Sequence, residues 1–273
     1  MYKRQDLDQF KIDRIKKILY GKKQKVSWES KTMNVLIPMA GRGSRFATQG
    51  YTFPKPLIDV KGKPMIQVVV DNLNIKAKYT FIVQKEHYEK YSLQYLLNLI
   101  APDCNIVQVD GITEGAACTT LLAKEFIDND EPLLMANSDQ FVEWDSNETL
   151  YAFSNGDCDG GILTFPASHP KWSYAKLDDD GFVSEVAEKK PISEHATVGV
   201  YWWKKGSDYV KYAEQMIEKN IRTNGEFYVC PVFNEAIGDD KRVRIKEIDK
   251  DGMWGIGTPE DLNYFLKNYE GDI

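Results

Sequence analysis

The residues best suited to do chemistry lie in one short stretch, MNVLIPMAGRGSRFATQGYTFPKPLIDVKGKPM, which covers residues 33–65. Gly41 and Gly43 allow the backbone to approach phosphate oxygens that a Cβ would push away, and Arg45 and Lys55 add positive charge. The two glycines alone are equally compatible with a plain turn between a strand and a helix. Together with the two cations they predict a site for a nucleoside triphosphate. The stretch has neither the GxxxxGK[ST] of a P-loop nor the third glycine of a dinucleotide fingerprint, which disfavours a P-loop ATPase and a dehydrogenase.

An alternation of strands and helices must position this loop. Residues 35–39 form a short apolar run typical of a strand, and a helix is expected over 65–73. Further strands are expected over 79–84, 105–109 and 132–136, alternating with helices over 87–100 and after Gly115. This alternation predicts a mostly parallel sheet covered on both faces, with ligands at the carboxyl ends of its strands.

The pattern changes from Gly160 onward. Four short strands, GILTF, SYAKL, FVSEVAE and ATVGVYWW, are separated by turn residues such as those at 178–181, which predicts antiparallel hairpins. Trp202 and Trp203 are adjacent in the last of these strands and point to opposite faces, so at least one is expected in the core. Helices over 207–219 and 259–267 are expected to close the fold.

The motifs A-G-x-G-S-R-F and P-K-P-L resemble the signature of the sugar-phosphate nucleotidylyltransferases. Later stretches follow in that family's order, at 114–117 (EGAA), 137–139 (NSD), 188–189 (EK), 199–201 (GVY), 225–228 (GEFY) and 257–261 (GTPED). The resemblance runs from Met33 to Tyr269. It implies a three-layer α/β/α, Rossmann-like (GT-A-like) fold with a mostly parallel central sheet and a small antiparallel substrate lip. The activity it implies is Mg²⁺-dependent nucleotidyl transfer with release of pyrophosphate.

The sequences IPMAGRGSRF and FPKPLIDVKGKPMI are most similar to those of the capsule-biosynthesis branch of that family. This branch includes a CTP:phosphoglutamine cytidylyltransferase beside enzymes that act on sugar 1-phosphates. The resemblance therefore implies two partners: an NTP, with CTP favoured, and a small phosphorylated substrate.

The resemblance also assigns roles to individual residues. Arg45 would grip the leaving β- and γ-phosphates, and Lys55 would hold the α-phosphate. Asp139 corresponds to the Mg²⁺ ligand, although its position alone is equally compatible with a turn or helix-capping aspartate. The other assignments are nucleotide binding by Ala40, Gly41, Gly43, Ser44, Gly115 and Ala116, and substrate binding by Glu188, Lys189, Gly199 and Glu226. Without the resemblance, Glu188 and Lys189 are more typical of solvated strand charges. Gly115 and Glu226 are then about equally typical of helix entries.

The chain departs from the family pattern near its C-terminus. In the segment MWGIGT, Gly255 stands where the family has its second metal carboxylate. This leaves three alternatives: a metal site with one carboxylate, a second ligand from elsewhere such as Asp249 or Asp251, or a weakened enzyme.

The composition fits an enzyme with one core, because the 273 residues are 42% apolar and 28% charged. The four cysteines, at 104, 118, 158 and 230, show neither CxxC pairs nor the spacing of a disulfide framework, which predicts reduced thiols in the cytoplasm. The three histidines are isolated from them, so a zinc site is not expected. The apolar runs are too short to span a membrane.

Charge is distributed unevenly along the chain. Residues 1–34 hold ten Lys/Arg against four Asp/Glu, whereas the remainder holds 25 against 37. The acidic remainder disfavours nucleic acid as a partner. We therefore divide the chain into a basic helical arm (1–32), with a helix over 6–20, and a nucleotidyltransferase domain (33–273). The narrow apolar stripe of the arm favours docking on its own body or on a second subunit, as in a homo-oligomer, over membrane binding.

Two other functions stay open. One is a glycosyltransferase of related fold, which consumes an NDP-sugar and chelates metal through a DxD. Asp157-Cys158-Asp159 has that spacing, but it precedes an apolar strand and does not follow one, which indicates a turn. The other is a catalytically silent, nucleotide-binding paralogue, which Gly255 favours and the presence of Arg45, Lys55 and Asp139 disfavours.

Overall fold

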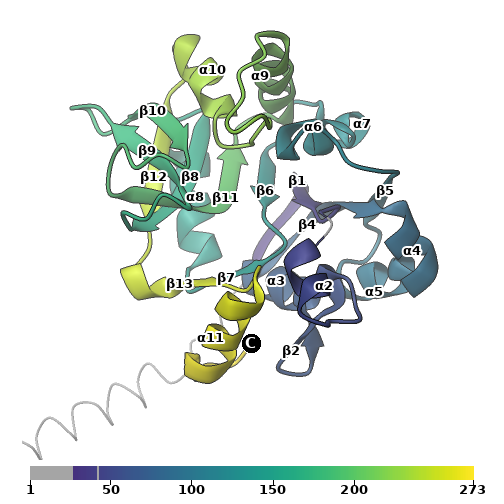
Figure 1. The fold of residues 1–273 in the computed structure, drawn as a ribbon. Coiled ribbons are helices and arrows are strands. Elements are labelled where there is room, and N and C mark those ends of the chain that lie inside the picture. Colours follow the sequence, from purple (N-terminus) through teal and green to yellow (C-terminus); the bar gives the residue numbers. More distant parts are fainter. Residues whose placement is uncertain (1–26, 42) are drawn as a thin grey trace, which may run out of the picture.

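A mixed nine-stranded sheet runs through the middle of the computed structural model, which describes residues 27–41 and 43–273 (Figure 1). The strand order is β10-β9-β11-β6-β1-β4-β5, and β8 pairs with β11 and with β12. The bounds are β1 (Trp28–Pro38), β4 (Ile75–Gln84), β5 (Asn105–Val109), β6 (Leu133–Ala136), β8 (Gly160–Pro166), β9 (Ser173–Leu177), β10 (Val183–Glu188), β11 (His195–Trp203) and β12 (Val243–Glu247). The predicted helix over residues 6–20 lies outside the described residues.

The half of the sheet formed by β6, β1, β4 and β5 is parallel, as predicted. Its central strand β1 is buried on both faces from Met33 to Ile37, which explains why the sequence from Val35 onward is a continuous apolar run. The strand starts earlier than that run, because Trp28 already pairs with Ile75 of β4.

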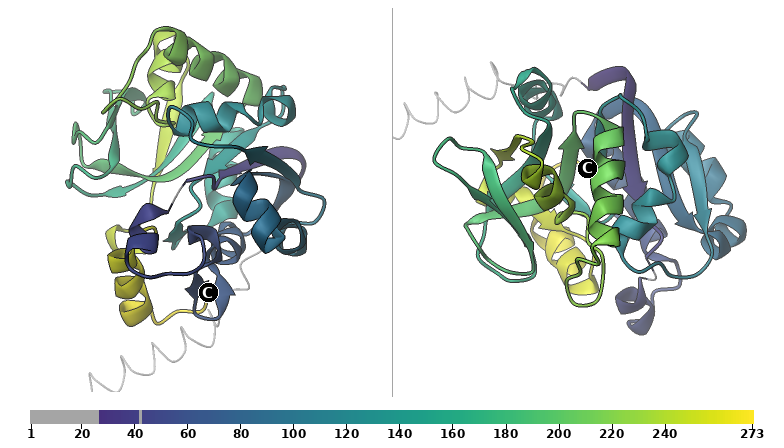
Figure 2. Two further views of the ribbon diagram at one scale, coloured as in Figure 1. Left: turned by 45° about the vertical axis from the view of Figure 1, so that its right-hand side comes forward. Right: turned by 90° about the horizontal axis from the view of Figure 1, so that it is seen from above.

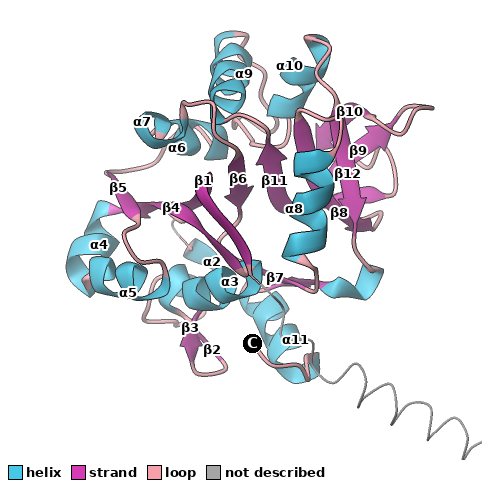
Figure 3. Ribbon diagram, turned by 180° about the vertical axis from the view of Figure 1, so that it is seen from behind, coloured by secondary structure: helices cyan, strands magenta, loops and turns pink. Residues whose placement is uncertain are grey.

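Helices cover both faces of the sheet, which gives the predicted three layers. One face packs against α3 (Met65–Leu73), α5 (Leu93–Ile100), α8 (Ser146–Asn155) and α11 (Pro259–Asn268), and Figure 3 shows α8 lying across the strands. The other face packs against α6 (Ala116–Leu121), α7 (Lys124–Ile127), α9 (Gly206–Glu218) and α10 (Val232–Gly238), with α9 visible from above in Figure 2. No helix among the residues that the structure describes is both long enough and apolar enough to cross a bilayer.

The two adjacent tryptophans show how β11 joins these layers. Trp202 stacks on Phe153 of α8 with ring centres 5.8 Å apart, and Trp203 stacks on Phe233 of α10 at 4.2 Å. Both are almost fully buried, so each face of β11 supplies one large aromatic to a different core. The expectation that at least one belongs to the core is confirmed.

The second half of the sheet is antiparallel where hairpins were predicted. β9 and β10 form a hairpin, and β11 runs antiparallel to β8, β9 and β6. Two long-range pairings were not predicted: β12 runs parallel to β8, and β7 (Gln140–Val142) pairs with β13 (Met253–Gly255). These pairs join residues more than eighty positions apart, and the three-residue strands β7 and β13 are too short to show a periodicity.

The single helix predicted over 87–100 is wrong. The structure has α4 (Lys85–Tyr91) and α5 separated by Ser92, whose φ of 50° is left-handed and ends the first helix. The break lets α5 bury Leu93 and Leu97, whereas α4 has no fully buried residue. Burial of the second half therefore overrides the local preference for one continuous helix.

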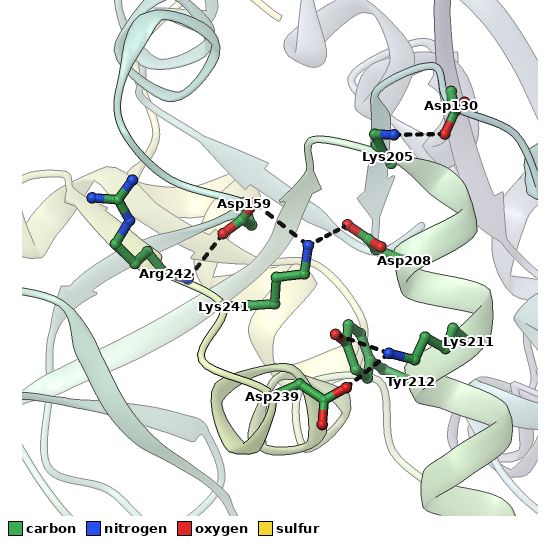
Figure 4. A network of polar contacts seen from close by, with 9 residues as sticks. All are labelled: Asp130, Asp159, Lys205, Asp208, Lys211, Tyr212, Asp239, Lys241 and Arg242. Carbon is green, nitrogen blue, oxygen red and sulfur yellow. Dashed lines mark hydrogen bonds and ion pairs between the residues drawn. The ribbon is translucent and has the colours of Figure 1, made fainter.

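A network of ion pairs ties the edge of the antiparallel half to α9 and to the segment that follows α10 (Figure 4). The ammonium of Lys241 lies 3.7 Å from Asp159 and 3.3 Å from Asp208. Asp159 also accepts the backbone N–H of Arg242, and Asp157 pairs with the guanidinium groups of Arg242 and Arg244. The two carboxylates of the DxD thus bind cations of the protein itself, in the bend that precedes β8.

We predict that Gly206→Ala destabilises the fold by about 2 kcal/mol or more, because overpacked sites cost this much. A Cβ on Gly206, at the start of α9, would lie 1.9 Å from the carbonyl oxygen of Ile127. Gly238→Ala, at the end of α10, is the matched control: its Cβ would meet nothing within 4 Å. Its free energy of unfolding should stay within about 1 kcal/mol of wild type. Urea unfolding measures both, and equal stabilities for the two variants would contradict the prediction.

Candidate active site

A cavity of about 570 Å³ opens at the carboxyl ends of the parallel strands. It brings together most of the residues that the sequence proposed: Ala40, Gly41, Arg45, Lys55, Gly115, Ala116, Asp139, Glu188, Gly199 and Glu226. Among the described residues, Gly43, Ser44 and Lys189 stand just outside its lining. The position of the cavity follows the rule that ligands of parallel α/β sheets bind where the strands end.

The glycine-rich loop connects β1 to the short helix α2 (Ser44–Thr48), which carries Arg45. Gly43 has a φ of 61°, and a Cβ on it would lie 3.1 Å from the Cβ of Lys55. A side chain at this position would therefore press on the backbone segment that carries Lys55. The glycine brings the two predicted cations to the same wall of the cavity.

The ammonium of Lys55 forms an ion pair of 2.8 Å with the carboxylate of Asp139, which lies between β6 and β7. Their side chains are 18% and 29% exposed, so the pair is only partly solvated. Gly257 makes room for it, since a Cβ there would lie 2.3 Å from Asp139 Oδ2. The predicted phosphate-binding cation and the predicted metal ligand therefore neutralise each other in this structure.

Gly115 is required by its contact with a neighbouring segment. Its φ of 139° is in the region that favours glycine, and a Cβ would lie 2.4 Å from the backbone N and O of Phe227. The N–H of Phe227 donates to the carbonyl of Glu114, and the N–H of Ala117 donates to the carbonyl of Phe227. The sequence assigned nucleotide binding to this glycine, and the structure adds a second constraint, the close approach of the protein's own backbone.

The opposite end of the cavity holds Glu188 and the residues around it. Burial raises the pKa of Glu188 above the ordinary glutamate value of 4.5, while the hydroxyl of Ser173 donates to its carboxylate. Lys189, with a left-handed φ of 56°, donates to the hydroxyl of Tyr228 and lies 4.5 Å from the centre of its ring. Tyr228 lines the cavity, so Lys189 is held at its rim by a residue that the sequence did not single out.

The structure adds other cavity residues that sequence reasoning missed, among them Gln84, Lys171, Trp172, Cys230 and Asp261. Only Asp261 carried a local signal, because it follows Thr258 with the spacing of a helix N-cap. Its N–H donates to the Thr258 hydroxyl, which in turn donates to its carboxylate. The other four come from three separate segments, with Lys171 and Trp172 adjacent in one of them, and have no shared sequence pattern.

Asp261 lies beside the position where the family pattern is broken. A Cβ on Gly255 would point to within 3.5 Å of Asp261 Oδ2. Asp249 and Asp251, the substitutes that the sequence suggested, are not in the cavity lining of the described residues. Among all the residues that the structure describes, no group of three or more His, Cys, Asp or Glu side chains stands close enough to hold a metal ion.

The fold and the cavity define a Rossmann-like α/β protein with its ligand site at the strand ends. Comparison with known families matches residues 34–270 to the family described as nucleotidyl transferase. Since the match covers most of the chain, this protein belongs to the nucleotidyl transferase family.

Individual relatives agree with this placement. The chain is 26% identical over 251 residues to the bifunctional protein GlmU of Methanocaldococcus jannaschii, covering 88% of this chain and 56% of the relative. It is 26% identical over 240 residues to the low-salt glycan biosynthesis nucleotidyltransferase Agl11 of Haloferax volcanii, covering 84% of this chain and 64% of the relative. The chain thus spans little more than half the length of these curated relatives.

Solved structures show the same fold. The nucleoside-diphosphate-sugar pyrophosphorylase of Vibrio cholerae RC9 superposes with a TM-score of 0.74 at 24% identity, over 86% of this chain and 100% of that one. The inositol-1-phosphate CTP transferase of T. maritima superposes with a TM-score of 0.67 at 13% identity, over 90% and 100%.

The raised pKa of Glu188 makes a prediction about stability and pH. The folded protein binds this proton more tightly than the unfolded chain does, so the carboxyl stabilises the fold below pH 4.5. That contribution is lost as the pH rises through the folded-state pKa. Glu188→Gln keeps an acceptor for Ser173 but cannot ionise, and should therefore gain stability relative to wild type between about pH 4 and pH 7.

Urea unfolding at both pH values checks this. Glu185→Gln, on the exposed side of the same strand β10, is the control and should follow the wild type. A Glu188→Gln variant whose stability relative to wild type is the same at both pH values would show that burial does not perturb this carboxyl.

Proposed function

We propose that this chain is a nucleotidylyltransferase that joins an NTP to a small phosphorylated acceptor and releases pyrophosphate. The observation that carries the proposal is that one cavity is lined by two chemically different groups of residues. One group is the glycine-rich loop with Arg45 and Lys55, and the other is Glu188, Gly199 and Glu226. A triphosphate and a polar acceptor need such neighbouring sites, because the reaction depends mainly on positioning and on neutralising charge.

In the proposed reaction, a phosphate oxygen of the acceptor attacks the α-phosphorus of the NTP. A new P–O bond forms as the bond from the α-phosphorus to the β-phosphate bridging oxygen breaks, and pyrophosphate leaves with that electron pair. Lys55 neutralises charge at the α-phosphate, and the guanidinium of Arg45 holds the leaving phosphates with paired N–H donors. Asp139, which pairs with Lys55 in this structure, would release this ammonium when the nucleotide binds.

The remaining assignments divide along the same cavity. Nucleotide binding falls to Ala40, Gly41, Gly43, Ser44, Gly115 and Ala116, and acceptor binding to Glu188, Lys189, Gly199 and Glu226. The buried carboxyl of Glu188 suits hydroxyl or amine donors of the acceptor, and the ammonium of Lys189 suits its phosphate.

Mg²⁺ is the proposed metal, and the donor set of the cavity is compatible with it. The oxygens of Asp139 and Asp261 are hard ligands of the type that Mg²⁺ prefers, and both side chains line the cavity. When bound, the ion would neutralise phosphate charge. We propose Asp139 as its main protein ligand and Asp261 as the carboxylate that stands in for a side chain at position 255.

Two of the similar proteins support a role in making activated precursors for glycan biosynthesis. Agl11 is named for glycan biosynthesis, and the T. maritima neighbour is named as a CTP transferase. We therefore propose CTP as the first nucleotide and a sugar 1-phosphate or phosphoglutamine-like molecule as the acceptor. Residues 33–273 would form the catalytic unit, acting in the cytoplasm, where the four free cysteines would stay reduced.

A pyrophosphate-release screen tests this function. CTP, UTP, ATP and GTP are each combined with a panel of sugar 1-phosphates, phosphoglutamine and polyol phosphates. The expected result is release that requires one NTP and one acceptor together. Release of free nucleoside diphosphate from an NDP-sugar, with no pyrophosphate in any combination, would instead favour a glycosyltransferase.

We predict that Arg45→Ala and Lys55→Ala each lower kcat by about 10²-fold or more, because each removes a charge that acts on the phosphates during transfer. Lys78→Ala is the control, since this exposed lysine lies at the far end of β4 from the cavity. Circular dichroism should show all three variants folded. Turnover close to wild type in either of the first two would refute its assignment.

The metal proposal makes a prediction about binding. With few protein carboxylates, Mg²⁺ should bind weakly to the nucleotide-free protein and more tightly when the NTP adds phosphate oxygens. Isothermal titration calorimetry measures both, and EDTA should abolish pyrophosphate release. Asp139→Asn should weaken Mg²⁺ binding the most and Asp261→Asn the next.

Asp251→Asn serves as the control for these titrations, since it lies outside the cavity lining. Tight Mg²⁺ binding without nucleotide that survives both the Asp139 and the Asp261 substitutions would show that the metal is held elsewhere.

A further inference from the structure

The guanidinium of Arg222 has three hydrogen-bond partners and one aromatic partner. Its Nε donates to Asn220 Oδ1 at 2.6 Å, Nη1 to the carbonyl of Gly225 at 3.0 Å, and Nη2 to Glu114 Oε2 at 2.5 Å. The guanidinium carbon also lies 3.9 Å from the centre of the Phe227 ring. Both the edge and one face of the group are therefore occupied, and the side chain is only 29% exposed.

These partners belong to two segments that face the cavity from different parts of the chain. Residues 113–117, called here the base loop, follow β5 and contribute Gly115 and Ala116 to the lining. Residues 222–228, called here the acceptor segment, follow α9 and contribute Glu226 and Tyr228. Arg222 reaches across from the acceptor segment to Glu114 of the base loop.

Backbone hydrogen bonds already join the two segments. The Phe227 N–H donates to Glu114, the Ala117 N–H donates to Phe227, and Gly115 has no Cβ to keep them apart. The tip of the acceptor segment is closed by reciprocal backbone hydrogen bonds between Thr223 and Glu226. Arg222 supplies the side-chain bonds that hold this tip, through Gly225, against the base loop.

We propose that Arg222 is a positioning residue that holds the acceptor segment against the base loop and thereby places the acceptor-binding side chains. The inference rests on the proposed function, which assigns acceptor binding to Glu226 and Lys189. Glu226 lies beside the anchored Gly225, and Tyr228, which holds the ammonium of Lys189, lies beside the anchored Phe227. Arg222 itself does not line the cavity and would act only through these neighbours.

Acceptor binding and NTP binding should respond differently to the loss of the Arg222 side chain. The base loop continues directly into α6, which packs against α9, whereas the tip of the acceptor segment depends on Arg222 for its side-chain anchors. Arg222→Ala should therefore raise the KM for the acceptor about tenfold, since hydrogen bonds to charged groups have that order of effect. The KM for the NTP should change less than about threefold.

The kinetic test uses Arg222→Ala with Arg222→Lys as the conservative variant and Arg244→Ala as the matched control. Arg244 also pairs with a carboxylate, Asp157, and stacks on an aromatic ring, Phe182 at 4.1 Å, but it lies on β12 outside the cavity. Arg222→Lys should recover part of the acceptor KM, and Arg244→Ala should leave both KM values unchanged. Equal rises of both KM values in Arg222→Ala, or an unchanged acceptor KM, would overturn the proposal.

Hydrogen–deuterium exchange tests the same contact without relying on activity. In Arg222→Ala the amides of Ala117 and Phe227 should exchange at least about tenfold faster than in wild type, because their hydrogen bonds join the two segments. Arg244→Ala should leave them unchanged. Unchanged exchange in Arg222→Ala would overturn the inference. If exchange is faster in the variant but the wild type releases no pyrophosphate, the role of Arg222 in joining the two segments is supported and only the proposed function is refuted.

Discussion

The antiparallel pairing of β6 with β11 is the contact on which both ends of the cavity depend. β6 leads directly into Asp139, and β11 carries Gly199, whose carbonyl accepts the N–H of Asn137. Gly199 has a φ of 82°, and a Cβ there would lie 2.1 Å from the side-chain nitrogen of Asn137. The parallel half, with the proposed nucleotide site, and the antiparallel half, with the proposed acceptor site, are therefore joined at a point where only a glycine fits. Any change in this register would move the two ends of the cavity relative to each other.

The charged side chains around the cavity have polar partners within the protein. Lys55 faces Asp139, Lys189 rests on the hydroxyl and ring of Tyr228, and Glu188 accepts from Ser173 with its pKa raised by burial. Each group thus has a protein partner that a ligand of matching charge can replace. Preformed polar partners of this kind lower the cost of desolvating the cavity, because no isolated charge is buried before the ligand arrives.

Sequence reasoning predicted the fold where patterns are local. The buried run of β1, the alternating helices and the hairpins of the second half were recognised because their periodicity lies within ten residues or so. It failed at Ser92, where burial of the second half of an expected helix decides the break, and at β7 and β13, which pair across more than a hundred residues. It also gave no sign that Gly115 must lack a Cβ because the backbone of Phe227, far along the chain, would lie 2.4 Å from it.

By itself, the sequence determined the parallel half of the fold, the glycine-rich loop and its two cations, since these depend on neighbouring residues and backbone geometry. Most proposed site residues line one cavity because the carboxyl ends of parallel strands meet at one edge. Only the tertiary structure decided that Asp261, and neither Asp249 nor Asp251, lies beside Gly255, and that Arg222 bridges to Glu114. Such contacts are made by side chains from separate elements, whose spacing is set by how helices pack on the sheet and leaves no period in the sequence.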